Sequence, residues 1–99
     1  MLNNYYFTYG TASQFPFRRG WTVVIAPDGI AAANIFREYH PNPNGSNILN
    51  CAWTYSEEAF MKTEMASGNV PMEYCHEVIG PLNDCLAYKQ QHPQFFRKV

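Results

Sequence analysis

The chain has 99 residues and a formal net charge of −1 at pH 7, which is the size of one domain. The balanced charge argues against a dedicated duplex-DNA binder, because such proteins usually carry a basic excess. Charged residues make up 15% of the chain and aromatic residues 16%, whereas an average domain is about 25% charged. Part of the surface is therefore expected to carry the uncharged polar and aromatic area that suits interfaces.

The cysteines and the N-terminus indicate a cellular compartment. Cys51, Cys75 and Cys85 are an odd number, which does not fit a secreted disulfide framework. Met1–Asn4 contains no basic region followed by an apolar run, so no signal peptide is expected. No apolar stretch approaches the roughly 20 residues of a transmembrane helix. We therefore expect a cytoplasmic protein with reduced thiols and no membrane partner.

Two strands and a helix are predicted in the first half of the chain. Tyr5–Tyr9 is a strand by propensity, and Gly10 stops it. Trp21–Ala26 alternates and is β-branched, which favours a second strand, antiparallel to the first if the connection closes a hairpin. Asp28 is a good N-cap for the helix that follows. Four residues then fall on one helical face: Ala32, Ile35, Phe36 and Tyr39.

The second half begins with an irregular loop and contains two more strands. The segment 40–47 holds two prolines and an Asn-Gly pair, which predict that loop. Ile48–Tyr55 is expected to be the third strand and Tyr74–Ile79 the fourth. Ser56 is a candidate N-cap for a short helix over Ala59–Met65. One or two helical turns are expected over Leu82–Lys89, before Pro93.

The element order β-β-α-β-α-β predicts an α+β fold with about four strands. We expect a mostly antiparallel sheet with helices on one face. Residues 1–80 are assigned to a single α+β domain, and residues 81–99 to a C-terminal appendage that packs on it or on a partner. The core is expected to bury six residues: Val23, Ile25, Ile35, Phe36, Leu49 and Trp53.

Several short blocks together support a comparison with a known group of proteins. The blocks are YYFTYG at 5–10, RGW at 19–21, LNCA at 49–52 and CHEVI at 75–79. This pattern resembles small proteins found in phages and mobile elements of gut Firmicutes, over roughly residues 5–79. The resemblance implies a context, the cytoplasm of an infected bacterial host, and provides no catalytic residue. Small phage-borne proteins of this kind often act against host defence, by occluding a protein or by sequestering a nucleotide signal.

A set of aromatic and arginine residues is the first candidate site. Aromatic faces stack on bases, and an arginine fork holds a phosphate in bidentate geometry. The alternative is that the aromatic residues fill the core and the arginines are solvated. The candidate ligand-binding residues are Tyr6, Tyr9, Phe15, Phe17, Arg18, Arg19, Trp21 and His76.

Two further sets of residues have reactive chemistry. Cys51, His76 and Glu77 are the parts of a cysteine nucleophile system, provided that the third and fourth strands pair. No Cys-x-x-Cys knuckle accompanies the cysteines, and Cys75 and His76 are adjacent on a strand, so no metal site is expected. A mid-strand cysteine is most often a small buried hydrophobe.

The tail, with Phe95 and Phe96 beside basic residues, fits a partner contact or a frayed terminus.

These observations favour a non-enzymatic binding protein of phage or mobile-element origin that antagonises host immunity. The expected mechanism is capture of a small nucleotide signal at the aromatic and arginine set, without a cofactor. A homo-oligomer is expected, because one small domain does not easily enclose a ligand. The alternatives are an inhibitor that occludes a host defence protein and a thiol-dependent hydrolase around Cys51 and His76.

Overall fold

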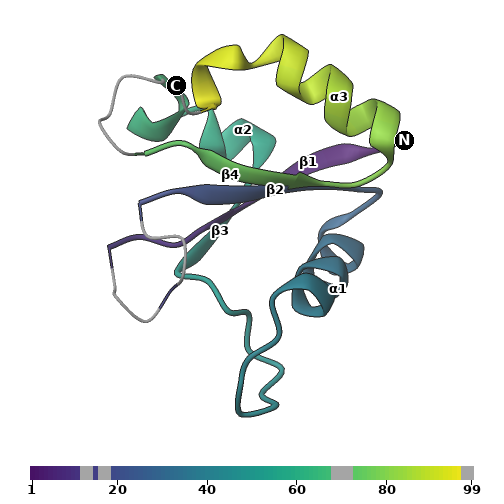
Figure 1. Cartoon of the computed structure of the whole chain (residues 1–99), viewed down its shortest axis with the longest axis vertical. Helices are drawn as coiled ribbons and strands as arrows, with labels where there is room; N and C mark the ends of the chain where they lie inside the picture. Colours follow the sequence, from purple (N-terminus) through teal and green to yellow (C-terminus); the bar gives the residue numbers. More distant parts are fainter. Residues whose placement is uncertain (12–14, 16–18, 68–72, 97–99) are drawn as a thin grey trace.

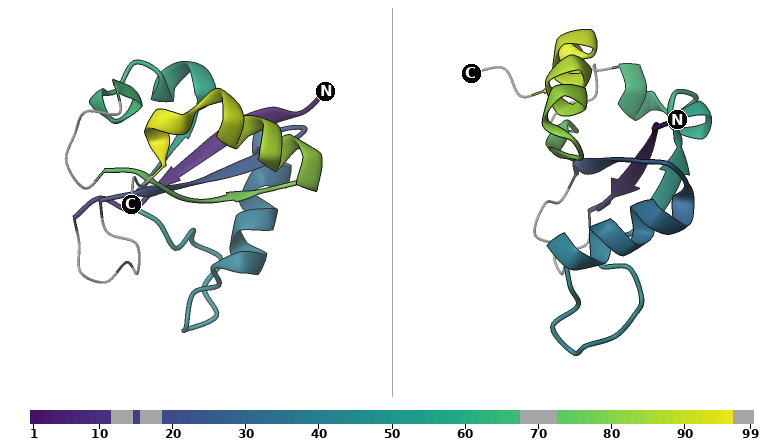
Figure 2. Two further views of the ribbon diagram at one scale, coloured as in Figure 1. Left: turned by 45° about the horizontal axis from the view of Figure 1, so that its top comes forward. Right: turned by 90° about the vertical axis from the view of Figure 1, so that its right-hand side faces the viewer.

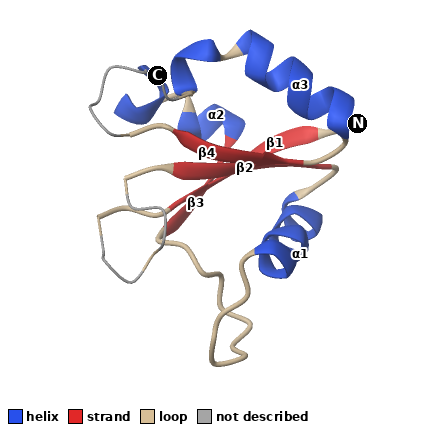
Figure 3. Cartoon of the chain, in the orientation of Figure 1, coloured by secondary structure: helices blue, strands red, loops and turns tan. Residues whose placement is uncertain are grey.

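Four strands form one mixed sheet in the order β3-β1-β2-β4 in the computed structural model (Figure 1). The structure describes residues 1–11, 15, 19–67 and 73–96. The strands are β1 (Asn3–Thr8), β2 (Trp21–Ala26), β3 (Trp53–Ser56) and β4 (Cys75–Ile79). The helices are α1 (Gly29–Tyr39), α2 (Glu57–Phe60) and α3 (Leu82–Gln91), with 3₁₀ segments η1 (Glu64–Ser67) and η2 (Pro93–Phe95) (Figure 3). The predicted α+β class is confirmed.

The first two strands form the expected antiparallel pair. Thr8 lies opposite Trp21 in its register, and the pairing continues beyond the strands to Gly10 and Arg19. The amide of Arg19 donates to the carbonyl of Gly10 at 2.5 Å. Both residues have positive φ, 61° for Gly10 and 68° for Arg19. The hairpin end thus forces one non-glycine residue into the left-handed region.

The other two strands occupy the two edges of the sheet. β3 pairs antiparallel with β1, and β4 pairs parallel with β2. The sheet is therefore mostly antiparallel, as predicted, but β3 and β4 are separated by two strands. The hypothesis that the third and fourth strands pair is wrong, and with it the approach of Cys51 to His76 by that route.

Helices cover both faces of the sheet rather than one (Figure 2). On one face α1 packs over β1 and β2, where Phe36 stacks on Phe7 with ring centroids 4.4 Å apart. On the other face α2 and α3 cover Tyr6 and Trp21. All six residues of β2 are buried. The one-face prediction failed because a central strand with apolar side chains on both sides needs cover on both sides.

Side-chain caps start the first two helices where the sequence predicts. Asp28 accepts from the amide of Ala31 at 2.8 Å, and Ser56 accepts from the amide of Ala59 at 3.2 Å. α2 is shorter than expected: it ends at Phe60, and the next helical segment is the 3₁₀ turn η1 at 64–67. Among the described residues, no helix combines the length and apolarity that crossing a membrane requires.

The C-terminal segment contributes to the core. α3 runs over ten residues, longer than the one or two turns expected. Cys85, Tyr88 and Phe95 are buried in one cluster with Tyr6 and Trp21. Residues 82–96 therefore close one face of the sheet.

The predicted core is correct at three positions and wrong at one. Val23, Ile25 and Phe36 are buried, whereas Trp53 is 65% exposed. Ile35 and Leu49 are only half-buried and pack at the margin of the α1 cluster. The error at Trp53 has a topological cause. The chain joins the sheet at residue 53 and not at 48, and it does so as an edge strand, which among the described strands pairs with β1 alone.

Candidate ligand-binding groove

Most of the predicted aromatic and arginine set does not converge. Tyr6 and Trp21 are fully buried under α2 and α3, whereas Tyr9 is fully buried on the α1 face. Tyr6 stacks on Phe60 with centroids 4.0 Å apart. These aromatic residues fill the core on opposite sides of the sheet, so they do not line one site.

The remaining members of that set have different positions. Phe15 is half-buried against the α1 cluster, and His76 is half-buried on β4. Phe17 and Arg18 lie outside the described residues. Arg19 is exposed at the hairpin end. Among the described residues of the predicted set, Arg19 is therefore the one that is exposed to solvent.

A chain of polar contacts crosses the α1 face from the end of β1 to β4. Thr22 donates to a carboxylate oxygen of Glu77 at 3.0 Å, so the Tyr9 hydroxyl, 2.6 Å from Thr22, must donate to Thr22. His40 Nε2 contacts the same oxygen of Glu77. Glu77 therefore joins the C-terminus of α1 to β4, which gives this carboxylate a structural role.

Burial raises rather than lowers the pKa of the three cysteine thiols. Burial raises the pKa of Cys51 to about 11 and that of Cys75 to about 12, and burial also raises the pKa of Cys85. Cys51 lies in the bend before β3 and not in a strand, and it is half-buried. A nucleophilic cysteine needs a lowered pKa. Among the described residues, no group of three or more His, Cys, Asp and Glu side chains is placed to hold a metal ion.

A groove of about 400 Å³ lies at the end of the sheet, beside Trp53. The sheet contributes Thr8 of β1 and both Trp53 and Tyr55 of β3 to its lining. The hairpin end supplies Arg19, η1 supplies Glu64, and the segment before β4 supplies Glu73. Ligand sites in proteins typically measure about 300–1,000 Å³, so this groove suits a small molecule.

Two hydrogen bonds between β1 and the backbone of residues 52 and 53 hold Trp53 at the groove. The amide of Ala52 donates to the Thr8 carbonyl at 2.7 Å, and the Thr8 hydroxyl donates to the Trp53 carbonyl at 3.1 Å. Side chains alternate along a strand, so Trp53 and Tyr55 point to the same face. Tyr55 packs edge-on against Phe60, with centroids 6.1 Å apart. Tyr55 is thereby anchored in the core, and the Trp53 ring remains available for contact.

Arg19 is positioned by its glycine neighbour. Gly20 is buried, and a Cβ there would contact the His76 ring and lie 2.7 Å from the Tyr74 carbonyl. This close packing fixes the backbone that precedes β2. The left-handed φ of Arg19 costs roughly 1–2 kcal/mol, and such strain clusters at ligand sites. Arg19 is therefore held at the groove at the expense of stability.

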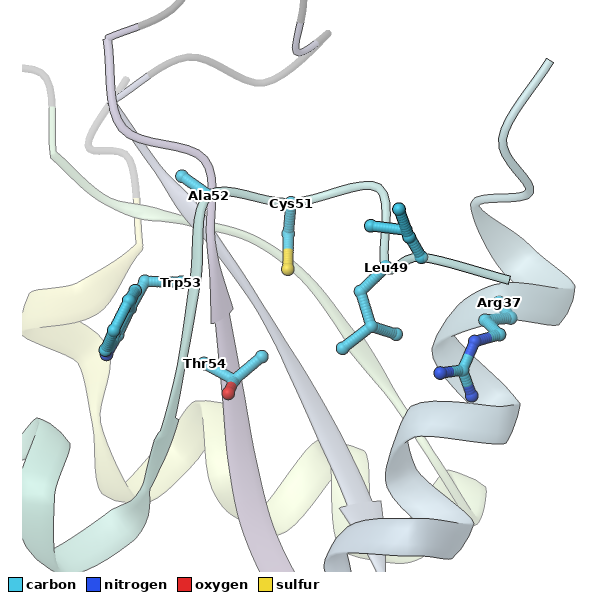
Figure 4. Close-up of a pocket in the computed structure, with 7 residues that line it drawn as sticks. Arg37, Leu49, Cys51, Ala52, Trp53 and Thr54 are labelled. Carbon is cyan, nitrogen blue, oxygen red and sulfur yellow. The ribbon is translucent and has the colours of Figure 1, made fainter. Parts of the chain in front are cut away.

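A second pocket, of about 460 Å³, lies on the α1 side of β3 (Figure 4). Leu49, Cys51 and Thr54 line it together with Arg37, and the Trp53 ring points away from Cys51 and Leu49. The Arg37 guanidinium donates to the Asn47 carbonyl at 2.6 Å and to the Asn34 side chain at 3.2 Å. Arg37 is thus already engaged, which makes this pocket the weaker candidate for an anion.

No family model, curated protein or solved structure matches this chain. The candidate site therefore rests on geometry. Sequence reasoning identified Arg19 but assigned Trp53 to the core. The alternation of Trp53 and Tyr55 on one strand face was visible in the sequence. The sequence did not show whether a helix covers that face at residue 53.

Proposed function

We propose that this chain is a non-enzymatic binding protein that captures a small nucleotide in the groove beside Trp53. The observation that carries the proposal is the presence in one groove of a tryptophan residue that is 65% exposed and an exposed arginine. Base stacking on an aromatic ring contributes about 1–3 kcal/mol. A hydrogen bond to a charged group contributes about 1.5–3 kcal/mol. Together they support reversible capture of a base and its phosphate.

The thiol chemistry favours binding over catalysis. Burial raises the pKa of Cys51 and Cys75, so both thiols stay protonated at neutral pH. The hydrolase alternative also required Cys51 near His76, but the strand order puts β3 and β4 at opposite edges. The hydrolase is therefore dropped.

The biological context of the proposal comes from the resemblance to phage and mobile-element proteins. In that context the captured nucleotide is a defence signal, and the protein antagonises immunity in the cytoplasm of an infected bacterial host. A homo-oligomer would help, because a second copy can close a groove that one small domain leaves open.

One observation favours the alternative, occlusion of a host defence protein. Within the described residues, no strand pairs with the outer edge of β3, and Ile48 before this strand and Trp53 at its start are 77% and 65% exposed. An exposed strand edge accepts an additional strand from a partner. The same tryptophan would then serve as an anchor in a protein interface.

The test is calorimetry and thermal shift with a panel of cyclic nucleotides, mononucleotides and ADP-ribose-type nucleotides. Trp53→Ala should abolish ligand-dependent stabilisation, whereas Ile48→Ala should leave it intact. Both variants remove an exposed apolar side chain, but Ile48 does not line the groove. A ligand released by heating should be chemically unchanged. If no nucleotide binds, the proposal is wrong and the protein-occluding alternative takes its place.

Arg19→Gly provides a second, sharper variant. Glycine adopts the left-handed φ of residue 19 without strain, so the melting temperature without ligand should stay constant or rise. Binding of the nucleotide should be lost, because its phosphate partner is gone. If Arg19→Gly instead unfolds the protein, Arg19 is a structural residue.

A further inference from the structure

The charges that line the groove are unbalanced. Among the described residues that line it, Arg19 supplies one positive charge, and Glu64 and Glu73 supply two negative charges, for a net of −1. Within the described residues, none of these three side chains forms an ion pair or a side-chain hydrogen bond. Lys62, which precedes the lining residue Thr63 in the sequence, lies 3.7 Å from Glu58, so that carboxylate already partly balances its charge. The described part of the groove thus combines the unpaired Arg19 with an excess of acceptors.

This imbalance limits how many phosphate groups a ligand can carry. One phosphate group can sit on Arg19 with charge-assisted hydrogen bonds. Each further phosphate brings negative charge toward Glu64 and Glu73, and like-charge contacts are unfavourable. A nucleotide with a single phosphate group therefore fits the groove better than a di- or triphosphate.

The carboxylates also restrict the base. An ionised carboxylate only accepts hydrogen bonds, through two oxygens side by side. Among the common bases, guanine presents two adjacent donors on one edge, its ring N1–H and its 2-amino group. Hypoxanthine lacks the amino group, and adenine presents an acceptor at the ring nitrogen. Glu73 is half-buried and Glu64 is exposed, so a hydrogen bond to Glu73 is screened less by water.

We propose that the groove selects a guanine nucleotide with one phosphate group. Guanine stacks on Trp53, its two adjacent donors bind the Glu73 carboxylate, and the phosphate binds Arg19. Glu64 at the rim disfavours additional phosphates. This inference rests on the proposed function and adds the identity of the base and the number of phosphates.

The experiment compares GMP, IMP and GTP as ligands of the full chain. The readouts are calorimetry and quenching of tryptophan fluorescence. Trp21 is fully buried, so quenching reports on Trp53. GMP should bind at least about tenfold more tightly than IMP, the discrimination typical of a two-donor contact to a base edge. GMP should also bind more tightly than GTP, and added salt should narrow that difference.

Two charge-neutral variants separate the contributions. Glu73→Gln should reduce the preference for GMP over IMP to about one, because the glutamine amide places a donor against a donor. Glu64→Gln should keep that preference and strengthen the binding of GTP relative to that of GMP. The melting temperature of each variant without ligand controls for folding, since neither carboxylate forms an ion pair or a side-chain hydrogen bond within the described residues.

Each contrary result has a distinct meaning. Equal binding of GMP and IMP would overturn the assignment of the base, while the proposed nucleotide capture would stand. Tightest binding of GTP would overturn the charge argument alone. Binding of other nucleotides from the wider panel but none of these three would reject guanine. Binding of no nucleotide at all would end both the proposed function and this inference.

Discussion

The buried hydroxyl pair of Tyr6 and Tyr88 tests how the C-terminal helix packs on the sheet. The two oxygens lie 2.6 Å apart, although the residues are 82 positions apart in the chain. Tyr6 is fully buried and Tyr88 is 3% exposed. Burial raises the pKa of both hydroxyls, so both remain neutral donors at neutral pH. This contact links β1 directly to α3.

We predict that Tyr6→Phe destabilises the fold by about 1–3 kcal/mol, the cost of a buried hydroxyl left without a partner. Tyr88→Phe should cost less. Its partner Tyr6 lies near Glu57, which adds to the burial effect in raising the pKa of Tyr6 and can accept its proton in a hydrogen bond. The double variant should cost less than the sum of the two single variants, because no orphaned hydroxyl remains.

Urea titration followed by circular dichroism measures all four proteins of this cycle. For a domain of this size, each kcal/mol corresponds to roughly 4–8 °C in melting temperature. A coupling free energy well above ~0.5 kcal/mol would support the contact. If the two substitutions are additive within that limit, the hydroxyls do not bond and α3 does not pack on β1 as described.

Three further predictions concern the core and the hairpin. Gly20→Ala should lower the free energy of unfolding by about 1–3 kcal/mol in urea titration, since its Cβ would lie 2.7 Å from the Tyr74 carbonyl. The control Gly29→Ala should be close to neutral, because the nearest atom to a Cβ there is at 3.8 Å. Equal effects of the two substitutions would refute the packing at Gly20. Phe36→Ala should cost ~3–5 kcal/mol, and a loss under about 1 kcal/mol would mean that α1 buries another face. Burial raises the pKa of Cys75 from 9.0 to about 12, so its contribution to stability is complete below pH 9 and declines toward pH 12. Cys75→Ala should make the loss of unfolding free energy between pH 9 and 10 less steep; an unchanged slope would contradict the burial of this thiol.

Local sequence accounts for the elements whose start and packing depend on neighbouring residues. The β-branched alternation of Trp21–Ala26 and the Asp28 cap were sufficient to place β2 and α1. Ser56 marked the start of α2 in the same way. Arg19 was identified as a candidate ligand-binding residue because it lies among aromatic residues in a chain that has few charged residues. Each of these predictions depends on residues within a few positions of one another.

The tertiary structure alone decided which aromatic residues form the core and which reach solvent. Tyr6 and Trp21 were predicted to meet a ligand and are buried, whereas Trp53 was predicted to be buried and lies at the groove. All three sit on strands with similar local patterns, so periodicity does not distinguish them. The difference arises from strand order, which places β2 at the centre and β3 at an edge. The strand order depends on which distant segments pair. In addition, α3, from the other end of the chain, covers Tyr6 and so makes it part of the core.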